Sequence, residues 1–220
     1  MKYGEKQMSE TFLVGALLAV VGGFLDAYTY LQRGGVFANA QTGNIVLFGI
    51  KIAEGKVWES IFYLIPILSF FLGIVVSEHI KETSQNRFKL HWRQITIVFE
   101  ILVLLSIVFM PYEGNMIANT LVAFACSLQV QSFRKINGNA YATTMCTGNL
   151  RSAAESLYVY KKTKNKEKLL VSLQYYGIIA FFIVGACLGT VLVRFFADDT
   201  ILFACAMLAL VFFLLFKKRA

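Results

Sequence analysis

Long apolar runs alternate with short polar segments along this chain. Six of the runs approach the roughly 20 residues that a helix needs to cross a bilayer. They lie at about residues 11–31, 58–77, 95–110, 115–133, 169–196 and 200–216. The pattern predicts an all-α fold, a polytopic transmembrane helical bundle with six spans.

Two shorter segments between these runs carry many polar residues. Residues 36–53 contain the sequence VFANAQTGNIVLFG, and residues 140–160 contain YATTMCTGNLRS. Both include the triplet Thr-Gly-Asn, at 42–44 and at 147–149. We expect each segment to form a short helix that re-enters the membrane or lies at its surface.

The distribution of basic residues indicates whether the two short segments cross the membrane. If they do not, 17 of the 21 lysine and arginine residues lie on the side that holds both termini, as is typical of cytoplasmic loops. If both crossed, the split would be 12 to 8, with Arg151 in mid-membrane, where a central arginine costs roughly 2.5–3.5 kcal/mol. We therefore expect six spans with both termini in the cytoplasm.

Composition supports a membrane protein and excludes other classes. Hydrophobic residues make up 57% of the chain and charged residues 15%, against roughly 25% charged in soluble domains. The net charge of +8 is concentrated in loops such as KKTKNKEK, which have no aromatic residues to stack on bases, so nucleic acid is not an expected partner. The four cysteines lie in or beside apolar runs without a CxxC spacing, and we expect neither a metal site nor a cofactor.

The repeated triplet indicates an internal duplication. The two copies are 105 residues apart, and the same offset places Asp26 opposite Gln131. Each triplet follows one predicted span and precedes two more, so residues 1–112 and 113–220 hold three spans each within a single membrane domain. Because three is odd, the second half must be inverted relative to the first, as in many secondary transporters.

The candidate substrate site consists of polar residues and glycines in the two polar segments and the spans before them. Asn, Gln and Thr side chains both donate and accept hydrogen bonds, and glycine lets backbone approach a partner closely. At membrane depth, non-helical backbone survives only inside protein or beside a water-filled cavity. We expect the following residues to share a polar space between the two halves: Asp26, Asn39, Thr42, Gly43, Asn44, Gln131, Thr144, Thr147, Gly148 and Asn149.

Simpler explanations exist for several of these residues. Thr and Asn are preferred N-cap residues, so the triplets would then only cap the short helices that follow. Asp26 is either a proton or cation site or an internal partner for Arg33, Gln131 or the triplet backbone. Glu100 also interrupts an apolar run, and we expect it to reach the cytoplasmic interface or Arg93.

The first half of the chain contains GGFLDAYTYLQRGGVFANAQTGNIVLFG, and the second half contains LQVQSFRKINGNAYATTMCTGNLRS. In these two segments the chain resembles the YoaK-like family of bacterial membrane proteins, a domain family of unknown function. The resemblance implies a multi-pass protein of the bacterial inner (plasma) membrane but supplies no substrate or reaction. In the second half NGNA replaces the paired Gly34 and Gly35, so a different turn is expected there.

Two classes of function fit these observations. The first is a small-solute transporter or channel with its pathway between the inverted halves. The second is a membrane interaction or regulatory protein whose polar motifs only hold its helices together. An enzyme is not expected, because no Ser-His-Asp arrangement, paired aspartates or HExxH motif occurs in the apolar region. The expected partners are the lipid bilayer, an unknown small solute and, as a further option, a second copy of the chain in a homo-oligomer.

Overall fold

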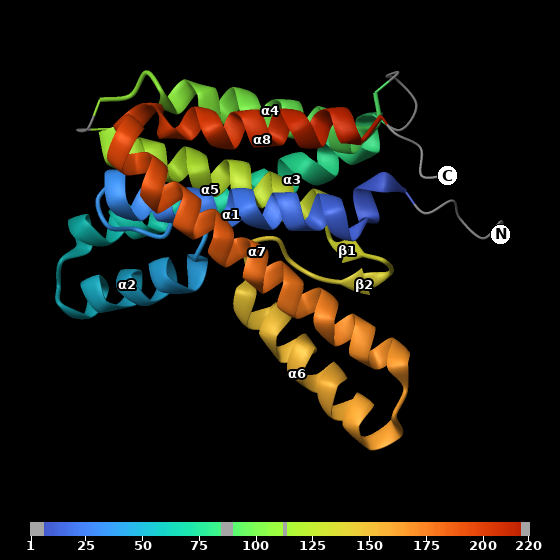
Figure 1. Ribbon diagram of the computed structural model, residues 1–220. Coiled ribbons are helices and arrows are strands. Elements are labelled where there is room, and N and C mark those ends of the chain that lie inside the picture. Colours follow the sequence, from blue (N-terminus) through green and yellow to red (C-terminus); the bar gives the residue numbers. More distant parts are fainter. Residues whose placement is uncertain (1–6, 85–89, 112–113, 217–220) are drawn as a thin grey trace.

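The computed structural model describes residues 7–84, 90–111 and 114–216, so part of each predicted cytoplasmic terminus lies outside it. Figure 1 shows a bundle of helices. The helices are α1 Phe12–Gln32, α2 Gln41–Ala53, α3 Val57–Ser84, α4 Trp92–Ile107, α5 Asn115–Ser132, α6 Cys146–Thr163, α7 Lys166–Phe196 and α8 Ile201–Leu214, with short 3-10 turns η1 Met8–Glu10 and η3 Ala197–Thr200. The predicted all-α fold is confirmed.

Three helical segments in the described residues have the length and hydropathy of membrane spans. They are Phe12–Gln32, Val57–Ser84 and the continuous stretch Lys166–Leu214, which is 49 residues long. At 1.5 Å per residue the last stretch would extend about 74 Å as one straight helix, more than twice the hydrocarbon core of a bilayer. The chain instead turns back at η3, where Ala197 has φ 45°, and forms α7 and α8.

A small hairpin is a departure from helix that the apolar pattern does not predict. Strand β1 Lys135–Ile136 pairs antiparallel with β2 Asn139–Ala140. Asn137 and Gly138 form its turn with φ 48° and 88°. Asn-Gly with both φ values positive is the preferred two-residue turn of a β-hairpin, which is the physical reason that the second half turns differently from Gly34 and Gly35.

Helix α1 occupies the centre of the bundle. It packs against α7 and α8 and touches α5, while α3 packs on α5, and α4 packs on both α5 and α8. The short helices have one main neighbour each, since α2 lies on α3 and α6 lies on α7. In Figure 1, α2 and α6 both begin beside the middle of α1 and run toward opposite ends of the bundle.

Glycines allow α1 and α7 to cross in close contact. A Cβ atom added at Gly185 would lie 2.0 Å from the Val20 carbonyl oxygen, and one added at Gly23 would lie 2.0 Å from the Phe182 carbonyl oxygen. These backbones can touch only because both residues lack a side chain, which is how small residues hold helices together in membranes.

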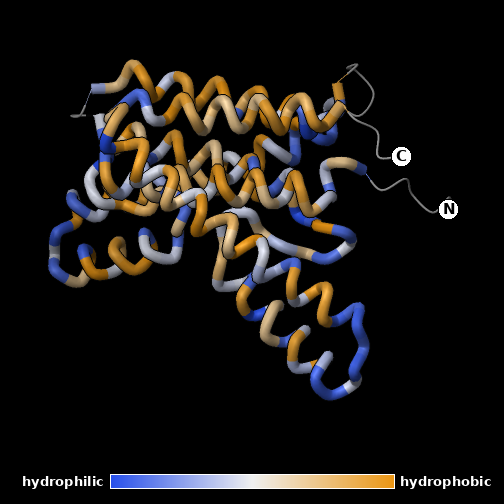
Figure 2. The backbone as a smooth tube through the Cα atoms, viewed as in Figure 1, coloured by the Kyte–Doolittle hydropathy of each residue, from blue (hydrophilic) through white to orange (hydrophobic). Residues whose placement is uncertain are grey.

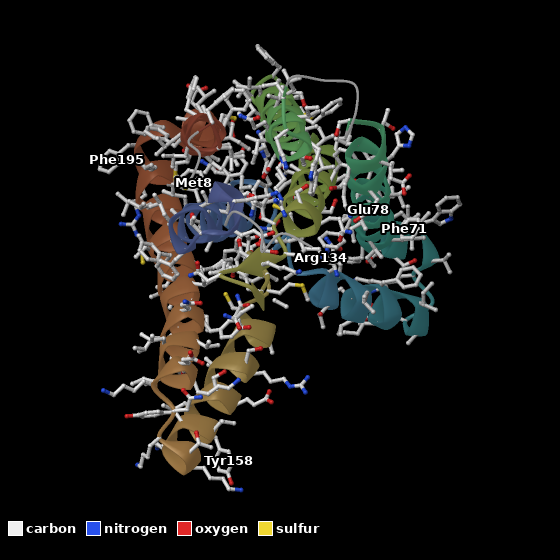
Figure 3. All side chains as sticks on the ribbon, turned by 90° about the vertical axis from the view of Figure 1, so that its right-hand side faces the viewer. Met8, Phe71, Glu78, Arg134, Tyr158 and Phe195 are labelled. Atoms are coloured by element: carbon white, nitrogen blue, oxygen red, sulfur yellow. The ribbon has the colours of Figure 1, made fainter. Side chains whose placement is uncertain are left out.

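Large apolar side chains cover the outside of the bundle. Phe71 on α3 is 66% exposed and Phe195 on α7 is 76% exposed, and Figure 3 shows both pointing away from the molecule. In Figure 2 hydrophilic backbone is concentrated in the loops and at the far end of the α6–α7 pair. An apolar surface of this extent is suited to lipid rather than to water.

The α1–α7 crossing can be tested with Gly185→Ala. The added methyl group would collide with backbone that has no freedom to rotate away, so we expect a loss of about 1–3 kcal/mol in the free energy of unfolding. Gly49→Ala on α2 is the matched control, because nothing lies within 4 Å of a Cβ there. Thermal unfolding in lipid nanodiscs measures both variants, and equal stability of the two would contradict the close crossing.

Candidate functional site

The loops that precede α2 and α6 meet at Gly22, in the middle of α1. The Asn39 side-chain amide donates to the Gly22 carbonyl at 3.1 Å. A Cβ at Gly22 would lie 2.9 Å from Thr144 Cγ2 and 3.2 Å from the Thr143 carbonyl oxygen. Asn39 and Thr144 are themselves 105 residues apart, so equivalent positions of the two repeated segments contact the same glycine.

Asp26 lies one helical turn beyond Gly22 on α1 and binds the loop that precedes α2. Its Oδ1 accepts a hydrogen bond from the Asn39 backbone N–H at 3.2 Å. Beside it, the Thr29 hydroxyl accepts from the Ala38 N–H at 3.3 Å. Asp26 is 9% exposed and is also within electrostatic reach of Cys146, the first residue of α6. Its carboxyl group therefore lies near the beginning of both short helices.

Three buried polar atoms around Gly22 have no hydrogen-bond partner among the described residues. They are Asn39 Oδ1, Thr143 Oγ1 and Thr144 Oγ1. Leaving a buried polar atom unpaired costs about 1–3 kcal/mol, so such atoms in native proteins call for an explanation. Unpaired atoms also occur elsewhere in the bundle, but these three belong to residues that contact one glycine next to a carboxyl group, which is an arrangement suited to water or a polar solute.

The two Thr-Gly-Asn triplets divide into buried and exposed residues. Asn44 and Asn149 are each 2% exposed. Asn149 forms two bonds with Ala142, accepting from its N–H at 3.2 Å and donating to its carbonyl at 2.7 Å. It thereby fixes the loop that carries Thr143 and Thr144. The remaining members of the triplets are exposed: Thr42, Gly43, Thr147 and Gly148.

The explanation that the triplets only cap the short helices is wrong. Helix α2 follows Ala40 and α6 follows Met145, and neither N-cap position has a side-chain hydrogen bond to the helix. In the first half the Asn44 amide donates to the Gln41 side chain, and Gln41 donates to the Ala38 carbonyl. The asparagines therefore shape the preceding loops, and the positive ends of the α2 and α6 dipoles are left without a side-chain cap.

Gln131 and Arg33 are bound elsewhere. The Gln131 amide donates to Glu78 on α3, so its hydrogen bond is made away from Asp26. Arg33 is fully buried and forms an ion pair with Asp198 at 3.5 Å. Its guanidinium also donates to the carbonyl of Ile107 at the end of α4 and to those of Met110 and Pro111 in the connection that follows. Arg33 is thus an anchor between α1, α4 and η3, and it is not the partner of Asp26.

The sequence suggested that Glu100 reaches the cytoplasmic interface or Arg93, and it does neither. Its side chain is fully buried, and neither carboxyl oxygen has a partner within the described part of the chain. Arg93 instead donates to the Ser132 carbonyl and the Ser9 hydroxyl and pairs with Glu10 at 3.2 Å. Helix α4 is continuous through Glu100, and the buried side chain of Glu100 is directed into the bundle.

Two residues of the site were not predicted. Gly22 was missed because nothing in the sequence distinguishes a glycine inside an apolar run that contacts a loop from one that packs against another helix. Thr143 was missed although it precedes Thr144 directly, and a pair of threonines before a helix is a signal for a polar loop.

Within the described residues no group of three His, Cys, Asp or Glu side chains is arranged to hold a metal ion, and the donors around Gly22 are amides, hydroxyls and one carboxylate.

Comparison with known proteins agrees with this architecture. A family model described as "Protein of unknown function (DUF1275)" matches residues 14–214. The chain belongs to the DUF1275 family. It is 23% identical over 191 residues to the UPF0700 transmembrane protein YoaK of Bacillus subtilis (strain 168), a match that covers 84% of this chain and 83% of that protein. No solved structure matches. The resemblance to YoaK-like proteins is therefore confirmed, and with it a membrane location.

The role of the triplet asparagines can be tested by comparing Asn149→Ala with Asn44→Ala. Asn149→Ala removes two hydrogen bonds to backbone, and we expect a loss of about 1–3 kcal/mol in the free energy of unfolding. Asn44→Ala removes one bond to another side chain and should cost less. The measurement is thermal unfolding in nanodiscs, and a larger loss for Asn44→Ala would contradict the loop-fixing role of Asn149.

Proposed function

We propose that this DUF1275 protein is a small-solute transporter or channel whose binding site surrounds Gly22 between two inverted halves. The observation that carries the proposal is the convergence of two non-helical segments on one glycine, with three unpaired polar atoms and Asp26 beside it. Irregular backbone inside a membrane bundle is typical of transport sites made by discontinuous helices.

The packing pattern supports the inverted repeat. Helix α2 begins at Gln41 and α6 at Cys146, 105 residues later. If α1 to α4 correspond to α5 to α8, every major contact has a counterpart: α1–α7 matches α3–α5, α2–α3 matches α6–α7, and α4–α5 matches α1–α8. The α4–α8 contact maps onto itself. Such matched contacts are expected when a two-fold axis in the membrane plane relates the two halves.

The proposed topology has α1, α3, α4, α5, α7 and α8 as spans and α2 and α6 as re-entrant half-helices. In Figure 1 the beginning of α1 and the end of α8 lie at the same end of the bundle. The basic α6–α7 connection is directed toward that end, as expected for the cytoplasmic side of a bacterial inner-membrane protein.

Charge around Gly22 favours a neutral polar solute. The uncapped N-terminus of each short helix contributes roughly +0.5 elementary charge. When Asp26 is ionised, its charge of −1 cancels the two together, and neither an anion nor a cation then gains much from the site. Unpaired amide and hydroxyl groups remain, and they suit a solute with several donors and acceptors, such as a polyol or an amide.

A second function is favoured by one observation. Thr42, Gly43, Thr147 and Gly148 are exposed, and small polar residues on helices that face a membrane are suited to packing against another helix. A membrane interaction or regulatory protein would use this surface for a partner and would carry no solute.

Solute flux into proteoliposomes discriminates between the two functions. With a panel of neutral polar solutes, we expect uptake that falls tenfold or more in Thr144→Val, because the hydroxyl that contacts the solute is lost while the volume of the side chain is kept. Thr190→Val is the control, because its hydroxyl donates to the Ala186 carbonyl within α7, and its flux should stay within twofold of the original. No uptake of any solute, or equal uptake by both variants, would contradict the transport proposal.

Cysteine labelling from the two sides of the membrane tests the proposed topology. In a cysteine-free background, Glu54→Cys and Lys164→Cys lie in the connections after α2 and after α6. A membrane-impermeant thiol reagent should label Glu54→Cys only from outside intact cells and Lys164→Cys only after access to the cytoplasm. Labelling of both from the same side would contradict the inverted arrangement.

A further inference from the structure

Glu100 is a buried carboxyl group that the proposed solute site does not use. It is fully buried on the face of α4 that also carries Ile97, Leu104 and Ile107. Both of its carboxyl oxygens lack a partner among the described residues. A charged carboxylate in apolar surroundings is strongly unfavourable unless a cation or several donors compensate it. Glu100 therefore holds a proton in this conformation.

Among the described residues, two thiols lie near Glu100. They belong to Cys126 of α5 and Cys205 of α8, the two helices against which α4 chiefly packs. Neither thiol supplies a positive charge, and the nearest basic residue along α4, Arg93, is held by Glu10 and Ser132. Cys126 is also within electrostatic reach of Asp26, so one thiol is a neighbour of both buried carboxyl groups.

Glu100 lies at the contact between the two proposed halves. Glu100 and Cys205 are 105 residues apart, so they are equivalent positions of the repeat that interact across the α4–α8 packing. A movement of one half relative to the other would change the contact between Glu100 and Cys205. Water would then reach a carboxyl that is otherwise dry, and hydration is what allows it to release its proton.

We propose that Glu100 is a membrane-embedded proton-binding site that couples proton movement to solute passage at Gly22. The proton is taken from water while the carboxylate is hydrated, is carried on a carboxyl oxygen while the site is closed, and returns to water when the halves rearrange. No bond other than O–H forms or breaks. The coupling part of the inference rests on the proposed transport function, whereas proton binding by Glu100 does not.

Infrared spectroscopy of the protein in lipid tests proton binding alone. At neutral pH the protein should show the C=O stretching band of protonated carboxyl groups, and Glu100→Gln should lower its intensity by the contribution of one carboxyl. Glu155→Gln, on the exposed face of α6, is the matched control and should leave the band unchanged. A band of undiminished intensity in Glu100→Gln would overturn the assignment of the proton to Glu100.

Flux driven by a pH gradient tests the coupling. An imposed gradient should accelerate solute uptake by the original protein at least fivefold, and Glu100→Gln should lose this acceleration while keeping downhill uptake within about threefold. Glu100→Asp keeps a protonatable group and should restore part of the acceleration, which distinguishes loss of a proton site from loss of folding. Full acceleration in Glu100→Gln would overturn the coupling. Absence of all uptake would instead refute the transport function and leave the infrared result to decide on Glu100.

Discussion

The structure depends on one constraint: non-helical backbone inside an apolar bundle must find hydrogen-bond partners within the protein. Two such segments lie against α1, and side chains and backbone of the protein form hydrogen bonds with their polar groups. Asp26 and Thr29 bind the first loop, Asn149 binds the second, and the Gly22 carbonyl accepts from Asn39. The polar residues of an otherwise apolar sequence are therefore concentrated where the chain leaves the helical conformation.

Glycine makes this arrangement possible on both sides of α1. Gly22 leaves room for the loop with Thr143 and Thr144, and Gly23 leaves room for the backbone of α7. A larger residue at either position would separate elements that the two short helices need as a support. The same helix thus provides the tightest packing of the bundle and the surface on which both half-helices begin, which ties the stability of the fold to the geometry of the candidate site.

The sequence predicted the helices well because long apolar runs leave few alternatives to helix in a membrane. It also indicated that Asn39, Asn149 and Thr144 lie in two polar segments that break the helical pattern. It did not predict how polar side chains are shared between neighbours: Gln131 is bound by Glu78, Arg33 binds Asp198 and the end of α4, and Glu100 is directed into the bundle. These partners lie on other helices, and a sequence pattern records which face of a helix is polar but not which helix that face meets.

If the residues around Gly22 form a polar site, solute and water must reach it at membrane depth. Thiol reactivity measures this access, with Thr144→Cys in a cysteine-free protein and a membrane-impermeant reagent. Ala123→Cys, in the fully buried part of α5, provides the unreactive reference. Our account predicts that Thr144→Cys reacts at least tenfold faster than Ala123→Cys and that a transported solute slows the reaction. Equal, negligible reactivity at both positions from either side of the membrane would contradict it.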